Sequence, residues 1–425
     1  MQQDSERVSV SGAGYVGLAT AVFLIRVGHE VVVVDVDRDR ISGLAGGESP
    51  LLEPGLGELI RYGVDQERLW FTTSEEEAMS TAGMHMVCVP TPDDGGGLLD
   101  LSMVESSVLA AVGHLPSGSV LVVRSTVPVG TCCRLAEAMD RDDLEVVFNP
   151  EFLQVGRVVE KMFEPNRVVV GARDAEAGLR VERLYESLDV PVFSTDLTTA
   201  ELVKQASNAY LAVRLSFVNE VAAMAGATDA DVDEVFRGMG ADPRIGQDFL
   251  VPGPGWGGSC LPKDARVLAK SAEVASGMRV VEAALESNTL RIGRVVDVVA
   301  EALGGFVSGR RIAILGLSFK AGTDDVRESP ALEVADQLLA AGAEVVAYDP
   351  MVAVVNCPEI ELVTDVISAA RGADALVVVT AWPEFRDLDY ATLASVVSGR
   401  HVVDACRVVD PAAVVRAGLE FVLAD

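Results

Sequence analysis

The stretch that decides the fold lies near the start of the chain and reads Ser11-Gly12-Ala13-Gly14-Tyr15-Val16-Gly17-Leu18. A β run, Arg7 to Val10, leads into it, and an apolar helical segment, Ala19 to Val27, follows it. A second apolar strand, Glu30 to Val34, then ends at Asp35. Strand, glycine loop, helix, strand and acidic residue in this order predict the first βαβ unit of a dinucleotide-binding domain.

Each glycine of this loop has a physical role. Gly12 allows the tight turn, Gly14 lets a pyrophosphate approach the backbone, and Gly17 lets the helix pack closely on the strand. A carboxylate at Asp35 binds ribose hydroxyls and would repel a 2′-phosphate, so the pattern favours NAD over NADP. Arg38 and Arg40 keep NADP open as an alternative, since arginines at these positions can bind the 2′-phosphate. They can also be solvated residues at the start of a helix.

Composition limits the class of protein. The chain has 425 residues, 49% of them hydrophobic and 23% charged, which is typical of a globular protein of two to three domains. Its apolar runs are too short to span a membrane, and its polar start leads directly into a strand, so we expect no signal peptide. The six cysteines show no paired or zinc-like spacing, which predicts reduced thiols in a cytoplasmic protein and no metal site.

The formal net charge is −30, which argues against nucleic acid or an anionic membrane as a partner. It does not exclude a small anionic ligand. A protein this acidic must gather a few of its 34 basic residues wherever it binds phosphate. Basic residues within motifs are therefore more informative here than the total charge.

Three further buried strands are each cut off by proline. In a doubly wound sheet, ligands bind at the carboxyl ends of the strands, so the polar residues that follow these strands are expected to converge on one crevice. The strands and residues are Met86–Val89 with Thr91, Val120–Arg124 with Thr126, and Val146–Phe148 with Glu151.

A long helix is predicted from about Thr199 to Ala225. Lys204 and Asn208 are four residues apart and share one face of it. An ammonium and an amide on one face can polarise the same carbonyl oxygen. The rest of the helix is apolar around much of its circumference, as expected of a helix that packs against other helices or a second subunit.

A glycine- and proline-rich loop delivers a single cysteine. It reads Pro252-Gly253-Pro254-Gly255-Trp256-Gly257-Gly258-Ser259-Cys260-Leu261-Pro262-Lys263-Asp264, a composition that forbids regular structure and predicts a loop shaped around a ligand. Lys263 can favour the thiolate, and the carboxylate of Asp264 can handle protons. A buried structural cysteine is the alternative for Cys260.

A second nucleotide-binding half is predicted after Gly304-Gly305. It comprises the strand Arg311–Leu315, a loop over residues 316–330, a helix to Ala340, and the strand Glu344–Tyr348. It lacks the full glycine fingerprint, so a different ligand is expected. The fold class is α/β, with two Rossmann-like doubly wound domains joined by a central long-helix region. The predicted domains are 1–198 for NAD, 199–304 for the helices and the cysteine loop, and 305–425 for a nucleotide sugar.

Taken together, these motifs resemble those of the UDP-glucose/GDP-mannose 6-dehydrogenase family along essentially the whole chain. The motifs that carry the resemblance are Gly12 to Gly17 with Asp35, Ser125 to Gly130, Asn149 to Leu153, Gly257 to Asp264, and Phe319 to Ser329. The resemblance implies NAD-dependent, four-electron oxidation of a nucleotide sugar's primary alcohol to a carboxylate. It also implies that Cys260 forms a thiohemiacetal and then a thioester, which water hydrolyses.

The resemblance assigns roles to individual residues. It implies that Lys204 and Asn208 stabilise the oxyanion, while Thr126, Glu151 and Asp264 position water and move protons. The implied cofactor-binding residues are Gly12, Gly14, Tyr15, Val16, Gly17, Asp35, Arg40, Thr91, Thr126, Lys263 and Arg327. The implied substrate-binding residues are Glu151, Phe152, Leu153, Lys204, Asn208, Arg244, Phe249, Leu250, Val251, Pro252, Gly253, Gly257 and Lys320.

One departure from the family pattern concerns proton handling. Val155 stands where the family usually has a second glutamate, which leaves Glu151 and Asp264 as the expected proton carriers. Ser259 argues against the N-acetylhexosamine branch, which typically has histidine there. UDP-glucose is the first choice of substrate, with TDP-glucose and GDP-mannose as alternatives.

Two other classes of protein share parts of this pattern. An epimerase that returns its hydride needs no thiol and usually carries a Tyr-x-x-x-Lys pair, which is missing where that fold would place it. A non-catalytic nucleotide-sugar-binding protein could lose Cys260, Lys204 or Asp264, but all three are present. Arg244 is expected to reach over from a partner subunit, so a homodimer or higher homo-oligomer is predicted.

Overall fold

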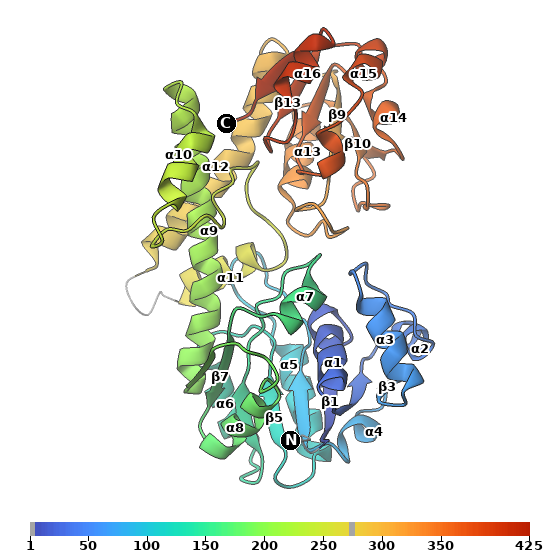
Figure 1. Cartoon of the computed structure of the whole chain (residues 1–425), viewed down its shortest axis with the longest axis vertical. Coiled ribbons are helices and arrows are strands. Elements are labelled where there is room, and N and C mark those ends of the chain that lie inside the picture. Colours follow the sequence, from blue (N-terminus) through green and yellow to red (C-terminus); the bar gives the residue numbers. More distant parts are fainter. Residues whose placement is uncertain (1–4, 272–276) are drawn as a thin grey trace. The chain divides into compact units, whose positions relative to one another are not determined.

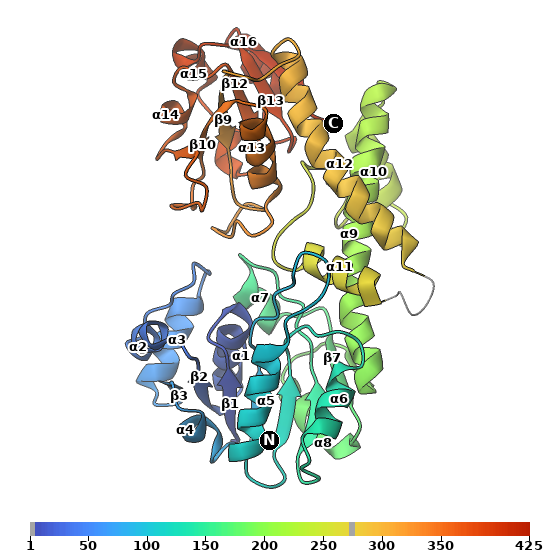
Figure 2. The same ribbon diagram turned by 180° about the vertical axis from the view of Figure 1, so that it is seen from behind.

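The computed structural model describes residues 5–271 and 277–425. The chain forms two compact units, Met1–Ser207 and Asn208–Asp425. Figures 1 and 2 show one sheet in each unit and the long helix α9 (Leu197–Ala227), within which the boundary between the units falls. The predicted fold class, two Rossmann-like domains joined by a long helix, is confirmed. The three-domain division stays a prediction.

The first unit is built on an eight-stranded sheet in the order β3-β2-β1-β4-β5-β6-β7-β8. All neighbouring strands are parallel except β6 and β7, which pair antiparallel. Most of its strands are runs of valine and other apolar residues buried on both faces, as parallel sheets require. Their bounds are β1 Arg7–Ser11, β2 Glu30–Val34, β3 Leu69–Thr72, β4 Met84–Val87, β5 Val120–Val123, β6 Glu145–Phe148, β7 Val168–Ala172 and β8 Val192–Thr195.

Helices cover both faces of this sheet (Figures 1 and 2). One core cluster joins the sheet to α1, α3, α7 and α8, and a second joins its other face to α4, α5, α6 and the start of α9. Alternate residues of β2 belong to different clusters, Val31 and Val33 to the first, Val32 and Val34 to the second. The helices are α1 Tyr15–Arg26, α2 Arg38–Ala45, α3 Leu56–Asp65, α4 Glu75–Met79, α5 Ser102–His114, α6 Thr131–Ala138, α7 Val158–Phe163 and α8 Ala175–Arg183.

Within the second unit, a six-stranded parallel sheet has the order β11-β10-β9-β12-β13-β14. Its two faces pack against separate sets of helices, α12 and α13 on one side and α14, α15 and α16 on the other. The strands are β9 Arg311–Leu315, β10 Glu344–Tyr348, β11 Ile360–Leu362, β12 Ala375–Val378, β13 His401–Asp404 and β14 Glu420–Leu423. The helices are α10 Val232–Gly240, α11 Leu261–Ser271, α12 Arg279–Ala302, α13 Pro330–Ala340, α14 Val366–Ala370, α15 Tyr390–Val396 and α16 Pro411–Arg416, with the short 3-10 helix η2 Pro383–Phe385.

The helical stretch predicted from Ala265 to about Leu303 is wrong as one segment. The structure has two helices there, α11 and α12, and Gly277 between them has a φ of +85° that a continuing helix cannot accommodate. The other main elements begin and end within a few residues of their predicted bounds. Helix α9 starts two residues early because Asp196 accepts a hydrogen bond from the amide of Thr199 (2.9 Å).

Candidate active site

The glycine loop of the first unit has the shape that a dinucleotide needs. Gly12 has a φ of +96°, and a Cβ there would lie 2.7 Å from the carbonyl oxygen of Cys88. A Cβ on Gly17 would lie 1.8 Å from the carbonyl oxygen of Gly12, so helix α1 packs on the loop only with glycine there. A Cβ on Gly14 would meet nothing within 4 Å. Space is therefore open at the start of α1, in whose first turn no acidic residue competes with a phosphate.

Asp35 lies at the carboxyl end of β2, as predicted. Its Oδ2 accepts a hydrogen bond from the amide of Ala13 (2.7 Å), and its Oδ1 accepts one from the amide of Asp37 (3.0 Å). The guanidinium of Arg40 lies 3.5 Å from Asp35 and 3.5 Å from Asp37. Two carboxylates therefore engage Arg40, which leaves it poorly placed to bind a 2′-phosphate. Tyr15 and Val16 open helix α1 and are partly buried.

The loops after β4 and β5 contact each other. The hydroxyl of Thr91 donates to the carbonyl oxygen of Thr126 (2.9 Å), and the hydroxyl of Ser125 donates to that of Val89 (2.7 Å). Two buried residues of α9 fix the second loop. Glu201 accepts from the amides of Gly130 (2.5 Å) and Cys132 (2.7 Å) at the start of α6, and Gln205 donates to the carbonyl oxygen of Val127 (2.6 Å).

A buried ion pair joins the loop after β6 to helix α9. The ammonium of Lys204, whose side chain is 3% exposed, lies 3.1 Å from Oε1 of Glu151 and donates to the carbonyl oxygen of Glu151 (2.7 Å). Burial alone would raise the pKa of Glu151, but Lys204 and the amide of Leu153 lower it overall. Glu151 is therefore an ionised carboxylate at neutral pH. Phe152 lies against the ammonium of Lys204, 5.1 Å from nitrogen to ring centre.

The loop around Val155 is held by a carboxylate from elsewhere in the chain. Glu53 accepts hydrogen bonds from the amides of Gly156 and Val158, the second at 3.2 Å. Both of its oxygens are engaged in these bonds, so Glu53 fixes the loop rather than offering a second proton carrier. The expectation that Glu151 and Asp264 carry the protons is consistent with this arrangement.

In the second unit, Cys260 is exposed and directly precedes helix α11. Its carbonyl oxygen accepts the first hydrogen bond of the helix, from the amide of Asp264 (2.9 Å). The amide dipoles at a helix N-terminus stabilise a negative charge placed beside them, either on a sulfur or on an oxygen bonded to the adjacent carbon. The alternative of a buried structural cysteine is therefore excluded for Cys260.

Asp264, four residues after Cys260, forms a polar pair with Asn208 of α9. Asp264 is 1% exposed, and its Oδ2 accepts a hydrogen bond from the amide of Asn208 (2.6 Å). Its Oδ1 lies 3.0 Å from the ammonium of Lys263, but the geometry is that of a charge contact, and this buried oxygen accepts no hydrogen bond from the described residues. Asp264 therefore keeps an acceptor for a hydroxyl group or a water molecule.

The loop over residues 249–253 is anchored at both ends. Leu250 is buried in the core cluster of α9 and α10, while Gly253 bonds through its amide to Asn219 (2.9 Å) and through its carbonyl oxygen to Arg291 (2.8 Å). Phe249 has an unusual φ of +59° for a non-glycine residue, and Val251 is 70% exposed. The anchors thus present apolar side chains outward, while Pro252 is buried.

Arg244 projects into solvent. Its side chain is 88% exposed, and its guanidinium pairs with Asp242 of the same loop (2.6 Å). The structure does not bring it to the other predicted substrate residues of its own unit through any hydrogen bond among the described residues. This exposure fits the prediction that Arg244 serves a partner subunit, which stays a prediction.

The second Rossmann-like half differs from the first at its acidic residue and in its glycine loop. Asp349, at the end of β10, corresponds in position to Asp35, but its Oδ2 accepts from the amides of Leu317 (2.8 Å) and Ser318 (3.0 Å) and from the indole of Trp382 (3.0 Å). Ser318 stands where the first half has Gly14, and its hydroxyl donates to Oδ2 of Asp349 (3.1 Å). These differences fit the prediction of a different ligand for this half, which stays a prediction.

Two predicted basic residues lie on the loop that follows β9. The ammonium of Lys320 lies 5.6 Å from the ring centre of Phe319. Arg327 binds Asp325 through two hydrogen bonds, at 2.9 and 2.6 Å, and its side chain is 56% exposed. That these two cations lie near a bound diphosphate stays a prediction.

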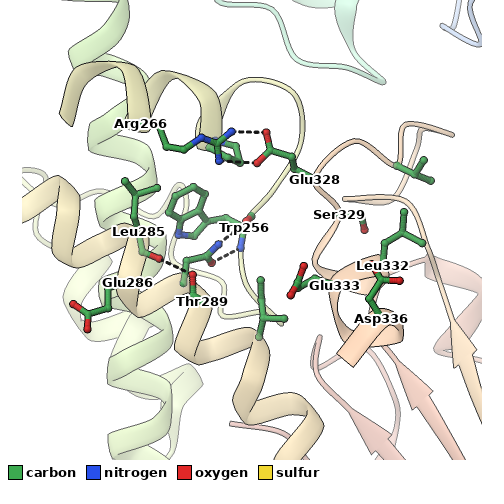
Figure 3. A pocket seen from close by; sticks show the side chains of 14 residues that line it. Trp256, Arg266, Leu285, Glu286, Thr289, Glu328, Ser329, Leu332, Glu333 and Asp336 are labelled. Carbon is green, nitrogen blue, oxygen red and sulfur yellow. Dashed lines mark hydrogen bonds and ion pairs between the residues drawn. The ribbon is translucent and has the colours of Figure 1, made fainter. Parts of the chain in front are cut away.

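The thiol loop and this basic loop touch. A Cβ on Gly257 would lie 2.0 Å from the carbonyl oxygen of Glu328, so only glycine fits there. The carboxylate of Glu328 in turn pairs with Arg266 of α11 at 2.8 and 2.7 Å, as Figure 3 shows. The close approach at Gly257 and the ion pair of Arg266 together hold the thiol loop against the loop that follows β9.

A cavity of about 580 Å³ lies beside this contact, between α12 and α13. Figure 3 shows Trp256 on its wall, held through two hydrogen bonds by Asn288. None of the predicted site residues lines this cavity. This cavity is therefore not the predicted site.

Comparison with known proteins identifies the family. Three models of the UDP-glucose/GDP-mannose dehydrogenase family match the chain: the NAD binding domain over residues 6–189, the central domain over 198–290, and the UDP binding domain over 313–411. The UDP-glucose 6-dehydrogenase of Rhizobium meliloti is 39% identical over 417 residues, and the alignment covers 94% of each protein. The chain belongs to this family.

Other relatives and structures agree with this assignment. The UDP-glucose 6-dehydrogenase YwqF of Bacillus subtilis is 36% identical, with 97% of this chain and 96% of that protein covered. A UDP-glucose dehydrogenase structure from Pyrobaculum islandicum has a TM-score of 0.88 at 36% identity, covering 95% of each chain. The UDP-glucose/GDP-mannose dehydrogenase described here is an NAD-dependent oxidoreductase, as its sequence motifs predicted. Among its described residues, no helix is long and apolar enough to cross a bilayer.

Sequence reasoning missed several buried polar residues that hold the loops of this dehydrogenase in place. They form no motif of their own, and each bonds to backbone or side chains far away in the sequence. The signal they offered is a single polar residue within or directly beside an apolar run. They are Glu53, Arg124, Glu201, Gln205, Asn219 and Arg291.

Replacing Asp35 by asparagine tests the cofactor preference. The substitution removes the negative charge and releases Arg40, so we expect the ratio of kcat/KM for NAD over NADP to fall at least about tenfold, equivalent to about 1.4 kcal/mol. Initial rates with each cofactor measure the ratio. Asp39→Asn, which removes an exposed carboxylate of α2 beside Arg40, is the control and should leave the ratio unchanged. An unchanged ratio in Asp35→Asn would contradict the role of Asp35.

Proposed function

We propose that the protein oxidises UDP-glucose to UDP-glucuronate in two NAD-dependent steps through a covalent bond to Cys260. The observation that carries the proposal is the exposed thiol of Cys260 at the start of α11, with the buried Asn208–Asp264 pair in the same unit. Family membership supports the chemistry, and relatives named UDP-glucose 6-dehydrogenase support the substrate. TDP-glucose and GDP-mannose remain the alternative substrates.

The proposed reaction begins at the primary alcohol of the sugar. The glycine loop of the first unit would hold NAD, which would supply the hydride acceptor for each of the two oxidations, a fresh NAD for each. The alcohol loses its hydroxyl proton to a carboxylate or water while its carbon loses the hydride, which leaves an aldehyde. Lys204 and Asn208, one turn apart on α9, carry the donors suited to the oxygen of that aldehyde.

The thiolate of Cys260 then adds to the aldehyde carbon and gives a thiohemiacetal. Loss of a second hydride from that carbon gives a thioester, in which the sulfur remains bonded to the oxidised carbon. Water attacks the thioester, the carbon–sulfur bond breaks, and the carboxylate and the thiol are released. Glu151, Thr126 and the unsatisfied Oδ1 of Asp264 are proposed to position that water and take its proton.

The decisive experiment measures NADH formed per nucleotide sugar consumed, with UDP-glucose, TDP-glucose and GDP-mannose in turn and the product identified by mass. Two NADH per sugar with a uronic acid product, at the highest kcat/KM for UDP-glucose, is the expected result. One NADH with an aldehyde product would overturn the four-electron proposal. Preference for another sugar nucleotide would overturn only the choice of substrate.

The proposed site is completed by a second copy of the chain. Helix α9 exposes a seven-residue repeat of large apolar side chains, Tyr210 (62% exposed), Phe217 (53%) and Met224 (65%). A stripe of this kind is typical of a helix–helix interface. We expect light scattering to give at least twice the 44.8 kDa chain mass, and Phe217→Asp to shift it toward the monomer.

Leu109→Asp, at an equally exposed position on α5, is the matched control and should leave the mass unchanged. A wild-type protein that is monomeric at micromolar concentration would contradict the dimer.

The six cysteines, none of which forms a disulfide, suit a reducing compartment, and we propose a cytoplasmic location.

A further inference from the structure

A buried arginine contacts the turn that carries Glu151, the catalytic carboxylate proposed above. Arg124 directly follows β5 and is 2% exposed. Its Nη1 donates to the hydroxyl oxygen of Tyr185 (2.7 Å) and to Oδ1 of Asn149. The hydroxyl of Tyr185 donates to the same Oδ1 (2.6 Å). Arginine, phenol and amide thus form a closed triangle in the core of the first unit.

The triangle fixes the turn that carries Glu151. Asn149 is itself buried, and its Nδ2 donates to the carbonyl oxygen of Val169 on β7 (2.8 Å). Both ends of its amide are therefore engaged, and only one orientation of the side chain satisfies them. Pro150 follows and limits the backbone further. Glu151, two residues after Asn149, emerges from this turn in a determined direction.

A guanidinium buried among neutral groups is costly unless a negative charge compensates it. Burial opposes the charge of Arg124, yet Tyr185, Cys88 and Glu151 raise the pKa of its guanidinium overall. The titratable groups that act on Glu151 are Lys204 from α9, Arg124 from the end of β5 and Cys88 from the end of β4. Burial raises the pKa of Cys88 to about 11, so this thiol is neutral where the enzyme works. Lys204 contacts Glu151 directly, whereas Arg124 contacts the side chain of Asn149, two residues before Glu151.

We propose that Arg124 is a positioning residue that orients Glu151 through Asn149 and keeps its carboxylate ionised, and thereby sets the lower pH limit of turnover. The inference rests on the proposed role of Glu151 as a proton carrier. Its two components are separable, because Tyr185→Phe removes hydrogen bonds of the triangle and keeps the charge. Arg124→Lys also keeps the charge, and Arg124→Met removes it with little loss of volume.

The first test is the pH profile of kcat/KM with UDP-glucose. Arg124→Met should move the acidic limb of the profile to higher pH by roughly half a unit to one unit, because Glu151 loses a positively charged neighbour that favours its ionised form. Arg124→Lys and Tyr185→Phe should leave the limb in place. A limb that does not move in a folded Arg124→Met variant, or that moves equally in Tyr185→Phe, would overturn the electrostatic role.

The second test does not depend on turnover. The free energy of unfolding of wild type and Arg124→Met is measured from neutral pH down to the lowest pH at which both stay folded, with and without Glu151→Gln. The stability difference between Arg124→Met and wild type should shrink as pH falls through the folded-state pKa of Glu151, and this pH dependence should vanish in the Glu151→Gln background. A pH dependence that persists there would refute the coupling. Failure of the proposed function would appear separately, as a wild type that oxidises none of the three nucleotide sugars.

Discussion

Replacing Cys260 by serine is expected to abolish oxidation of the nucleotide sugar to the acid. A serine hydroxyl at the start of α11 lacks the thiolate's nucleophilicity, so the aldehyde is not captured and no thioester forms. We expect steady-state formation of acid to fall by at least about a thousandfold, a loss comparable to removal of an essential covalent nucleophile. The measurement is NADH production together with mass analysis of the product.

The size of this loss separates Cys260 from the other cysteines. Cys357→Ser alters a partly buried thiol of the same unit and should keep the wild-type rate. A single NADH per enzyme active site in Cys260→Ser, with aldehyde retained, would agree with a first oxidation that needs no thiol. Undiminished turnover to acid in this variant would rule out the covalent scheme.

The fold could be predicted because its signals are local. Most strands are short apolar runs, several crossover helices follow loops rich in glycine or proline, and Gly12 and Gly17 leave no room for a side chain. Such features are visible in the sequence because they depend on neighbouring residues. The direction of β7, which pairs antiparallel with β6, could not be predicted, since an apolar strand reads the same in either direction.

Residues of the candidate site could be predicted from the sequence only where several reactive side chains occur within one loop. Cys260, Lys263 and Asp264 occur within one stretch, whereas the partner of Lys204 lies 53 residues away. Arg124 was visible as a charge at the end of a valine-rich strand, but its role depends on Asn149 and Tyr185, which only the folded sheet brings to it. Buried polar residues of this kind are recognised by their partners, and the sequence does not identify those partners.

Replacing Lys204 by methionine is expected to damage both stability and turnover. The ammonium is buried beside Glu151, so its removal leaves a buried carboxylate without its contact cation and should cost about 3–5 kcal/mol in the free energy of unfolding. If Lys204 also stabilises the developing oxyanion, kcat should fall by about a hundredfold to a thousandfold. Chemical denaturation and NADH production measure the two effects.

The pH dependence of the stability loss has a definite sign. Lys204 helps to hold the pKa of Glu151 below its usual value, so this carboxylate stabilises the native state above its unfolded pKa of about 4.3. That contribution is lost as pH falls through the folded pKa. The stability gap between wild type and Lys204→Met should therefore be widest near neutral pH and narrow in acid.

The double variant Lys204→Met with Glu151→Gln separates the structural and catalytic roles of Lys204. A neutral amide no longer requires a cation and can still accept the hydrogen bond from the amide of Leu153, so much of the lost stability should return. Turnover should not return, because the oxyanion still lacks its ammonium donor. If stability and kcat recovered together, Lys204 would act only by supporting Glu151, and the oxyanion would have to be stabilised by Asn208 and the N-terminus of α11.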